Sequence, residues 1–140
     1  HQLSIVKGRD TSLDRALINM PPVNTTNSLT FKNEKLNNLK LGITSQYVFR
    51  QNEFPNNNFE VFIPETETTE VVDLSTPPDA YHLLGFTSSI DFSVFNKSTL
   101  NVGLDVSNIF NTEYRDYLNR LRYYADDLGR NVTLRLKLNY

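Results

Sequence analysis

The chain has 140 residues, 39% of them hydrophobic, and its 14 basic and 16 acidic side chains give a formal net charge of −2. The basic residues are scattered rather than gathered in a run, which excludes the charge pattern of a nucleic-acid-binding protein. Cysteine is absent, so disulfides and thiolate metal sites are excluded as well. The apolar runs are far shorter than the ~20 residues of a membrane-spanning helix, so any contact with a membrane must be made by strands.

Alternation of apolar and polar residues predicts six β-strands. Weak alternation occupies residues 2–7 and 23–32, and clear alternation occupies residues 38–50, 84–94 and 100–110. The last stretch, NVTLRLKLNY, is the most regular and alternates without exception from Val132 to Tyr140. Since successive side chains of a strand point to opposite sides, each predicted strand has one apolar and one polar face.

The predicted connections alternate strictly between short and long. Residues 33–38 and 96–98 form tight polar turns, whereas residues 8–22, 52–80 and 111–129 form long loops. Short turns at one end and long loops at the other are typical of an up-and-down outer-membrane barrel. A soluble β-sandwich with a Greek-key arrangement has no reason for this pattern, but it stays open as the alternative.

Strand length and aromatic placement favour the same interpretation. Five of the six predicted strands span roughly 10 residues or more, which matches the ~9 to 11 tilted residues that cross a bilayer. Aromatic residues stand near the strand ends, as in an interfacial girdle; they are Phe31, Tyr47, Phe49, Tyr81, Phe110 and Tyr140. Because the smallest outer-membrane barrels have about eight strands, six strands predict an open barrel segment completed by missing sequence or by partner chains. The start at His1, with neither an initiator Met nor an apolar leader, also predicts a piece of a longer chain.

The C-terminal third carries a specific signature. The stretch SNIFNTEYRDYLNRLRYYADDLGRNVTLRLKLNY (Ser107–Tyr140) resembles the end of TonB-dependent outer-membrane receptors of the Bacteroidetes type, with their N-[IL]-F-[ND]-x-x-Y-R-[DN]-Y-L and R-x-x-A-D-x-x-G-R-N motifs. Upstream, VKGRDTSLDRALINMPP (Val6–Pro22) is similar to a family loop, with Ala16 in place of a usual Pro, and STPPDAYHLL (Ser75–Leu84) also fits.

This resemblance implies that residues 1–140 are the C-terminal portion of a roughly 22-stranded antiparallel barrel in the bacterial outer membrane. The remaining barrel, the plug and the segment that contacts the TonB complex would precede it. The long loops would be extracellular, and the short turns and the C-terminus periplasmic. The implied function is active import of a scarce solute, most often an iron–siderophore chelate, and not catalysis.

The resemblance also assigns roles to the two faces of the strands. Outer-membrane lipid would contact the apolar face. Five charged side chains of the polar face would line the lumen, namely Lys40, Asp91, Asp105, Arg135 and Lys137. The signal read by the barrel-assembly machinery would lie in the last strand, at Leu134, Leu136, Leu138 and Tyr140.

The loop 111–129 is rich in arginine and tyrosine. Guanidinium groups bind carboxylate or phosphate bidentately, so an anionic small-molecule cargo could contact Arg115, Tyr117, Arg120 and Arg122. A structural interpretation is favoured instead: Thr112 caps a short helix, with Glu113 in its first turn. The arginines then pair with the loop's own carboxylates, which are Asp116, Asp126 and Asp127.

No other constellation predicts chemistry. The acidic residues Glu65, Glu67, Glu70 and Asp73 lack the ligand spacing of a calcium loop, so the stretch FEVFIPETETTEVVDL is interpreted as a solvated hairpin. The sequence has no nucleophile elbow, phosphate loop or histidine cluster, and predicts no catalytic residue, metal or cofactor. The alternative function is a soluble β-sandwich module that binds glycans or protein through its tyrosine-rich loops.

Overall fold

The computed structural model describes residues 1–95 and 98–140 and is all-β. One antiparallel sheet has six strands, β1 (Gln2–Ser4), β4 (Asn24–Asn33), β5 (Leu39–Val48), β8 (Tyr81–Val94), β9 (Ser98–Ser107) and β10 (Asn131–Asn139). Two separate hairpins are formed by β2 (Arg9–Asp10) with β3 (Arg15–Ala16), and by β6 (Phe59–Ile63) with β7 (Thr68–Val72). A short 3-10 helix, η1 (Arg120–Tyr123), lies in the last loop. Within the described residues, no helix has the length and apolar character to cross a membrane.

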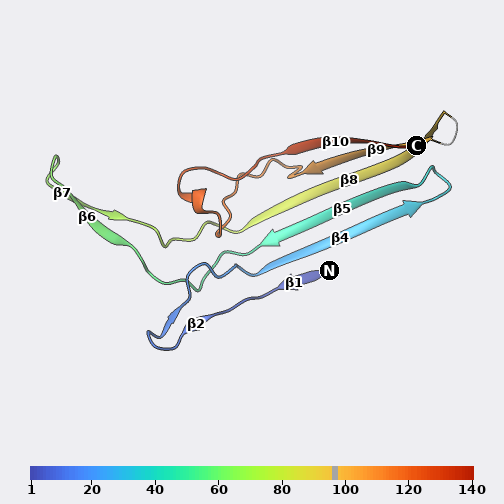
Figure 1. Ribbon diagram of the computed structural model, residues 1–140. Coiled ribbons are helices and arrows are strands. Elements are labelled where there is room, and N and C mark those ends of the chain that lie inside the picture. The colour runs from blue at the N-terminus through green and yellow to red at the C-terminus, as the bar shows by residue number, and fades with distance from the viewer. Residues whose placement is uncertain (96–97) are drawn as a thin grey trace.

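The six strands confirm the alternation pattern and follow one another across the sheet in chain order (Figure 1). Their ends differ from the prediction by a few residues: β8 begins at Tyr81 rather than Leu84, and β9 ends at Ser107 rather than Phe110. Left-handed backbone at Asn108 and Asn111, with φ of 49° and 54°, ends β9 because such a conformation breaks the ladder. Of the predicted tight turn 96–98, Asn96 and Lys97 lie outside the described residues.

The register collects apolar side chains on one face of the sheet. One row of apolar residues runs across the sheet from β4 to β10, one residue on each of five neighbouring strands. Each residue pairs with the next, in the order Leu29, Ile43, Phe86, Val106 and Val132. Leu29 is 75% exposed and Leu136 is 65% exposed. In the described part of the chain, only Val48, Tyr81 and Tyr117 are buried hydrophobic residues. The sheet therefore has no conventional core beneath its apolar face.

The opposite face is polar, and it carries all five residues predicted to line a lumen. One row of paired residues across the sheet runs from Lys40 through Ser89 and Gly103 to Arg135. A second row runs from Asp91 through Asn101 to Lys137. Asp91 accepts hydrogen bonds from the Asn101 Nδ2 at 2.6 Å and from the Asn38 Nδ2 at 2.9 Å. The structure thus confirms that these charges share one face.

The aromatic residues predicted near the strand ends do not all lie on the apolar face, and their role as a girdle stays a prediction. Tyr81 pairs with Val48 on the polar face, where both side chains are buried, so Tyr81 does not lie with Tyr47 on the apolar face. Its hydroxyl instead donates to the Asp116 Oδ2 at 2.9 Å. Phe110, predicted to continue a strand, lies in the turn after β9 and is 67% exposed.

The long loops lie at one end of the sheet, opposite the turns that join β4 to β5 and β8 to β9 (Figure 1). This arrangement confirms the predicted separation of short and long connections. The end that carries the long loops is called the loop end below.

Candidate functional site

The three long loops contact one another at the loop end, although they are far apart in sequence. The Lys7 Nζ donates to the Glu53 Oε1 at 2.5 Å, which ties the first loop to the second. The Gln51 Nε2 donates to the Met20 carbonyl at 2.8 Å and makes a second link between them. The Tyr123 hydroxyl, from the third loop, donates to the Leu74 carbonyl of the second loop at 2.7 Å. The loops therefore form one connected surface.

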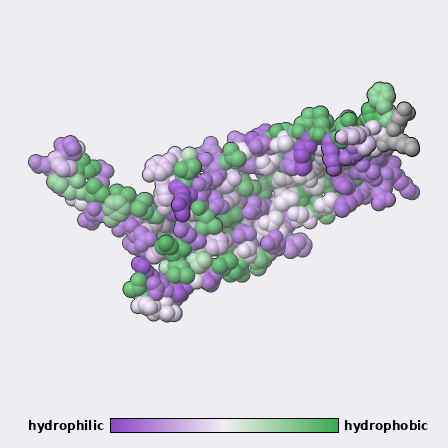
Figure 2. All heavy atoms as spheres, in the orientation of Figure 1, coloured by the Kyte–Doolittle hydropathy of each residue, from purple (hydrophilic) through white to green (hydrophobic). Residues whose placement is uncertain are grey.

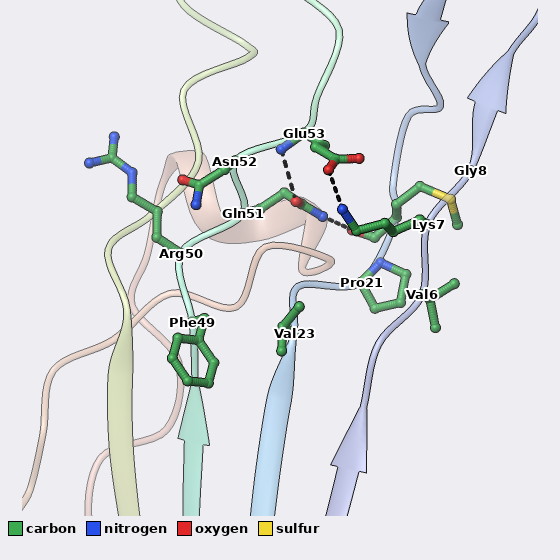
Figure 3. A pocket seen from close by; sticks show the side chains of 11 residues that line it. Val6, Lys7, Gly8, Pro21, Val23, Phe49, Arg50, Gln51, Asn52 and Glu53 are labelled. Carbon is green, nitrogen blue, oxygen red and sulfur yellow. Dashed lines mark hydrogen bonds and ion pairs between the residues drawn. The ribbon is translucent and has the colours of Figure 1, made fainter.

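The first two loops enclose a cavity of about 260 Å³, shown in Figure 3. Its lower wall is apolar, with Val23 just before β4 begins and Phe49 just after β5 ends, and Lys7, Gln51 and Glu53 converge at its upper side. Gly8 lets the Met20 and Leu17 side chains approach this wall closely, because a Cβ there would lie 2.6 Å from the Met20 sulfur and 2.8 Å from the Leu17 Cδ1 and would displace them. No pattern in the sequence indicated this cavity, since its key contact joins residues 46 positions apart.

The third loop is ordered by Arg122, one of the predicted cargo-binding residues. Arg122 is 8% exposed, and its guanidinium lies 4.2 Å from the centre of the Tyr117 ring and 4.8 Å from that of Tyr123. The Nη1 donates to the Tyr117 carbonyl and the Nη2 to the Tyr123 hydroxyl. The guanidinium of Arg122 is therefore engaged by two aromatic rings and two hydrogen bonds within the loop. Arg122 thus has a structural role in this loop.

Arg115 is also engaged within the loop. Its Nε donates to the Asp126 Oδ1 at 2.5 Å and its Nη1 to the Arg122 carbonyl at 3.0 Å. Tyr117 is buried, whereas Arg120 is exposed. Of the four residues predicted to contact an anionic cargo, Arg115 and Arg120 are both exposed, although Arg115 is already paired with Asp126. Cargo contact by these four stays a prediction.

The structural interpretation of this loop is right in kind and wrong in detail. Arg115 pairs with Asp126 as predicted, but the other two carboxylates bind different groups. Asp116 accepts from Tyr81, and the Asp127 Oδ2 accepts from the Asp116 amide at 2.7 Å. The predicted helix capped by Thr112 is absent: η1 begins at Arg120, and its cap is Asn119, whose side chain accepts from the Leu121 amide at 2.9 Å.

The third loop also covers part of the polar face. A cavity of about 350 Å³ lies between Thr44, Thr87 and Asp105 of the sheet and Tyr114 and Leu128 of the loop. Tyr114 stacks on Tyr81, with ring centres 4.5 Å apart. Burial, together with the carboxylates of Asp127 and Asp116, raises the pKa of the Tyr114 phenol, so the ring is neutral and presents a polar and an apolar edge to the cavity.

The residues predicted to form the assembly signal occupy one face of β10. Leu134, Leu136 and Leu138 alternate with Arg135 and Lys137 and are each more than half exposed. Tyr140 follows directly after the strand and is fully exposed. This geometry agrees with the alternation in the sequence, and the role as a signal stays a prediction.

Comparison of the chain with protein-family models, with curated protein sequences and with solved structures finds no match.

Proposed function

We propose that the chain is a wall segment of an outer-membrane transport barrel, with its apolar face on lipid and its polar face toward the lumen. The observation that carries this proposal is the apolar face, which runs across five paired strands from Leu29 to Val132. Its outer members Leu29, Ile43 and Val132 are exposed, and Phe86 and Val106 between them are half-buried. Apolar side chains in alternate positions are stable against lipid hydrocarbon but are costly over such an area in water.

The loop end supports the same proposal. Tyr114 and Leu128 lie over the polar face and leave the apolar face uncovered. A soluble sandwich needs the reverse arrangement, because its two sheets pack through their apolar faces. Within residues 1–95 and 98–140, the only other sheets are the two small hairpins at the loop end. These contacts favour the barrel over the sandwich module.

The resemblance to TonB-dependent receptors supports a specific transport role. We infer that the complete protein is a TonB-dependent active transporter that imports a scarce solute, with an iron–siderophore chelate as the first candidate. Its further partners are the rest of the barrel and plug, the TonB complex and the barrel-assembly machinery. Uptake of a labelled ferric siderophore by cells with and without the intact gene tests the cargo, and equal uptake would assign a different solute.

The direction of the two faces can be tested with nitroxide labels, because the chain has no cysteine. Single cysteines replace Leu134 or Arg135 in the complete protein, which is labelled in its native membrane. We expect the label at Leu134 to collide mainly with oxygen, which concentrates in lipid, and the label at Arg135 mainly with a water-soluble nickel chelate. Equal preference for the nickel chelate at both positions, with extraction of the protein in the absence of detergent, would establish the soluble module.

A further inference from the structure

A further cavity, of about 220 Å³, lies where all three long loops meet. Ile18 lines it from the first loop, Asn57 and Leu74 from the second, and Tyr117 and Arg122 from the third. Asn57 and Leu74 lie at the base of the β6–β7 hairpin, just outside its two strands. Figure 2 shows hydrophobic and hydrophilic residues intermixed at the loop end. The cavity is therefore built from three segments that are far apart in sequence, and its wall combines both kinds of side chain.

Arg122 is the one charged side chain that is buried among the described residues, at 8% exposure. No carboxylate of residues 1–95 and 98–140 forms an ion pair with it, whereas Arg115 and Arg135 each have one. A buried charge is costly unless an opposite charge compensates it. The Tyr117 and Tyr123 rings and two oxygen acceptors offset part of this cost, but neither a ring nor a carbonyl carries a formal negative charge. The described chain thus leaves Arg122 without a counter-ion.

The guanidinium of Arg122 also keeps donors that the loop does not use. Its Nη1 and Nη2 each donate one hydrogen bond inside the loop, to the Tyr117 carbonyl and the Tyr123 hydroxyl. Its Nε has no acceptor in the part of the chain that the structure describes, where every buried side-chain nitrogen has a partner, so the Nε is accessible. Five N–H groups in a planar fork match the two oxygens of a carboxylate. Because Arg122 lines the cavity, a carboxylate there can accept from the remaining donors.

The other walls of the cavity indicate the body of the ligand. Ile18, Pro55 and Leu74 are apolar, and Tyr117 and Tyr123 contribute aromatic rings. No acidic side chain of the described residues lines the cavity, so nothing there repels an anion. Its volume is below the ~300–1,000 Å³ of sites that enclose a drug-sized ligand. The cavity therefore fits a small molecule with a flat or apolar body rather than a large chelate.

We propose that the cavity at the junction of the three loops binds a small carboxylate with an apolar or aromatic body, and that Arg122 is its counter-ion. Of the four residues predicted to contact an anionic cargo, Tyr117 and Arg122 line this cavity, and Arg115 and Arg120 do not. The inference does not depend on which face of the sheet meets lipid, so its failure and that of the transport proposal are separable.

Binding of benzoate to the complete protein in detergent micelles tests this inference. Saturation-transfer NMR, in which magnetisation passes from the protein to a bound small molecule, measures the affinity, and empty micelles are the blank. We expect saturable binding of benzoate and at least about tenfold weaker binding of benzamide, which has the same ring and size but no charge. Failure of benzoate to bind would show that a carboxylate elsewhere in the complete protein already pairs with Arg122, and would overturn the proposal. Equal affinity for benzamide would overturn it as well.

A change from amide to carboxylate at the cavity wall tests where benzoate binds. Asn57→Asp keeps the shape of the side chain and the amide that donates to the Ser75 Oγ, but supplies Arg122 with an internal counter-ion. Asn56→Asp adds the same charge outside the cavity lining and is the matched control, since a carboxylate can still accept from the Asn58 amide. We expect Asn57→Asp to weaken benzoate binding at least about tenfold and Asn56→Asp to leave it unchanged. Unchanged binding in Asn57→Asp, or an equal loss in both variants, would refute the assigned site.

Discussion

Arg135 of β10 lies over Gly103 of the neighbouring strand and donates from its Nη2 to the Asp105 Oδ2 at 3.2 Å. A Cβ at position 103 would lie 3.8 Å from the Arg135 Nε, in ordinary contact, so the Arg135 side chain packs directly over this position without requiring a glycine there. The pair fixes the face of Arg135 and therefore the opposite face of Leu136. Substitutions at the adjacent positions 135 and 136 can therefore test which face of β10 meets lipid.

Leu136→Arg is expected to block assembly far more than Arg135→Leu. An arginine that faces lipid at the bilayer midplane costs ~2–4 kcal/mol, whereas loss of the exposed Arg135–Asp105 pair costs ~1 kcal/mol or less. The measurement is the yield of heat-modifiable folded protein on a cold gel. Equal yields from the two variants would contradict the proposed orientation.

Arg122→Lys is expected to loosen the third loop. A lysine keeps the charge but loses the planar stack on Tyr117 and the paired donors, which removes about 2 kcal/mol from a buried charged contact. Chymotrypsin cleavage at Tyr123 should then be about 30-fold faster, because cleavage follows the population of the open loop. Arg120→Lys, at an exposed position, is the control and should leave the rate unchanged.

Asp91→Asn is expected to weaken the turn end of the sheet. Both carboxylate oxygens accept from side-chain amides, those of Asn38 and Asn101, and an asparagine would turn an NH₂ group toward one of these donors. The lost hydrogen bond lowers stability by about 1 kcal/mol. The temperature at which the heat-modifiable band disappears should fall, while Ser93→Ala should behave as the unmodified protein; an unchanged temperature for Asp91→Asn would show that the network adds nothing.

The base of the β6–β7 hairpin is expected to respond to acid through Asp73. Hydrogen bonds from Thr76, and then from Ser75, lower the pKa of Asp73 to about 2, compared with 3.8 ordinarily. Because the pKa is depressed in the folded state, the carboxylate stabilises the turn above about pH 4, and this contribution is lost as the pH falls through about 2. The protection factor of the Thr76 amide, which corrects for the intrinsic pH dependence of exchange, should fall over that window and should be independent of pH in Asp73→Asn. A constant protection factor in the unmodified protein from pH 4 to 2 would contradict this assignment.

The strands could be predicted from the sequence because their periodicity is local. Val132 to Leu138 alternate along one strand, and the same rule predicts which residues share a face without knowledge of the neighbours. The side of Tyr81 could not be predicted from its position at a strand end. It depends on the pairing with Val48 and on Asp116, which lies 35 residues away.

The loop contacts were beyond prediction for the same physical reason. Arginine binds an internal carboxylate or a foreign anion with equal chemistry, so sequence alone does not decide between Asp126 and a cargo for Arg115. The helix was misplaced because Thr112 and Asn119 both satisfy the preference for a capping residue. In the structure Thr112 is used elsewhere, since its hydroxyl donates to the His82 carbonyl at 3.3 Å.

The hydrogen bonds between the loops determine how the loops can move together. Lys7 holds the first loop to the second, and Tyr123 holds the second to the third, so the three loops are connected in series. A force or a ligand that displaces the second loop therefore strains its hydrogen bonds to both neighbours, whereas displacement of the first or third loop strains the bond to the second. The second loop should therefore transmit motion between the other two, and a molecule that touches it would also alter the cavity between the third loop and the polar face.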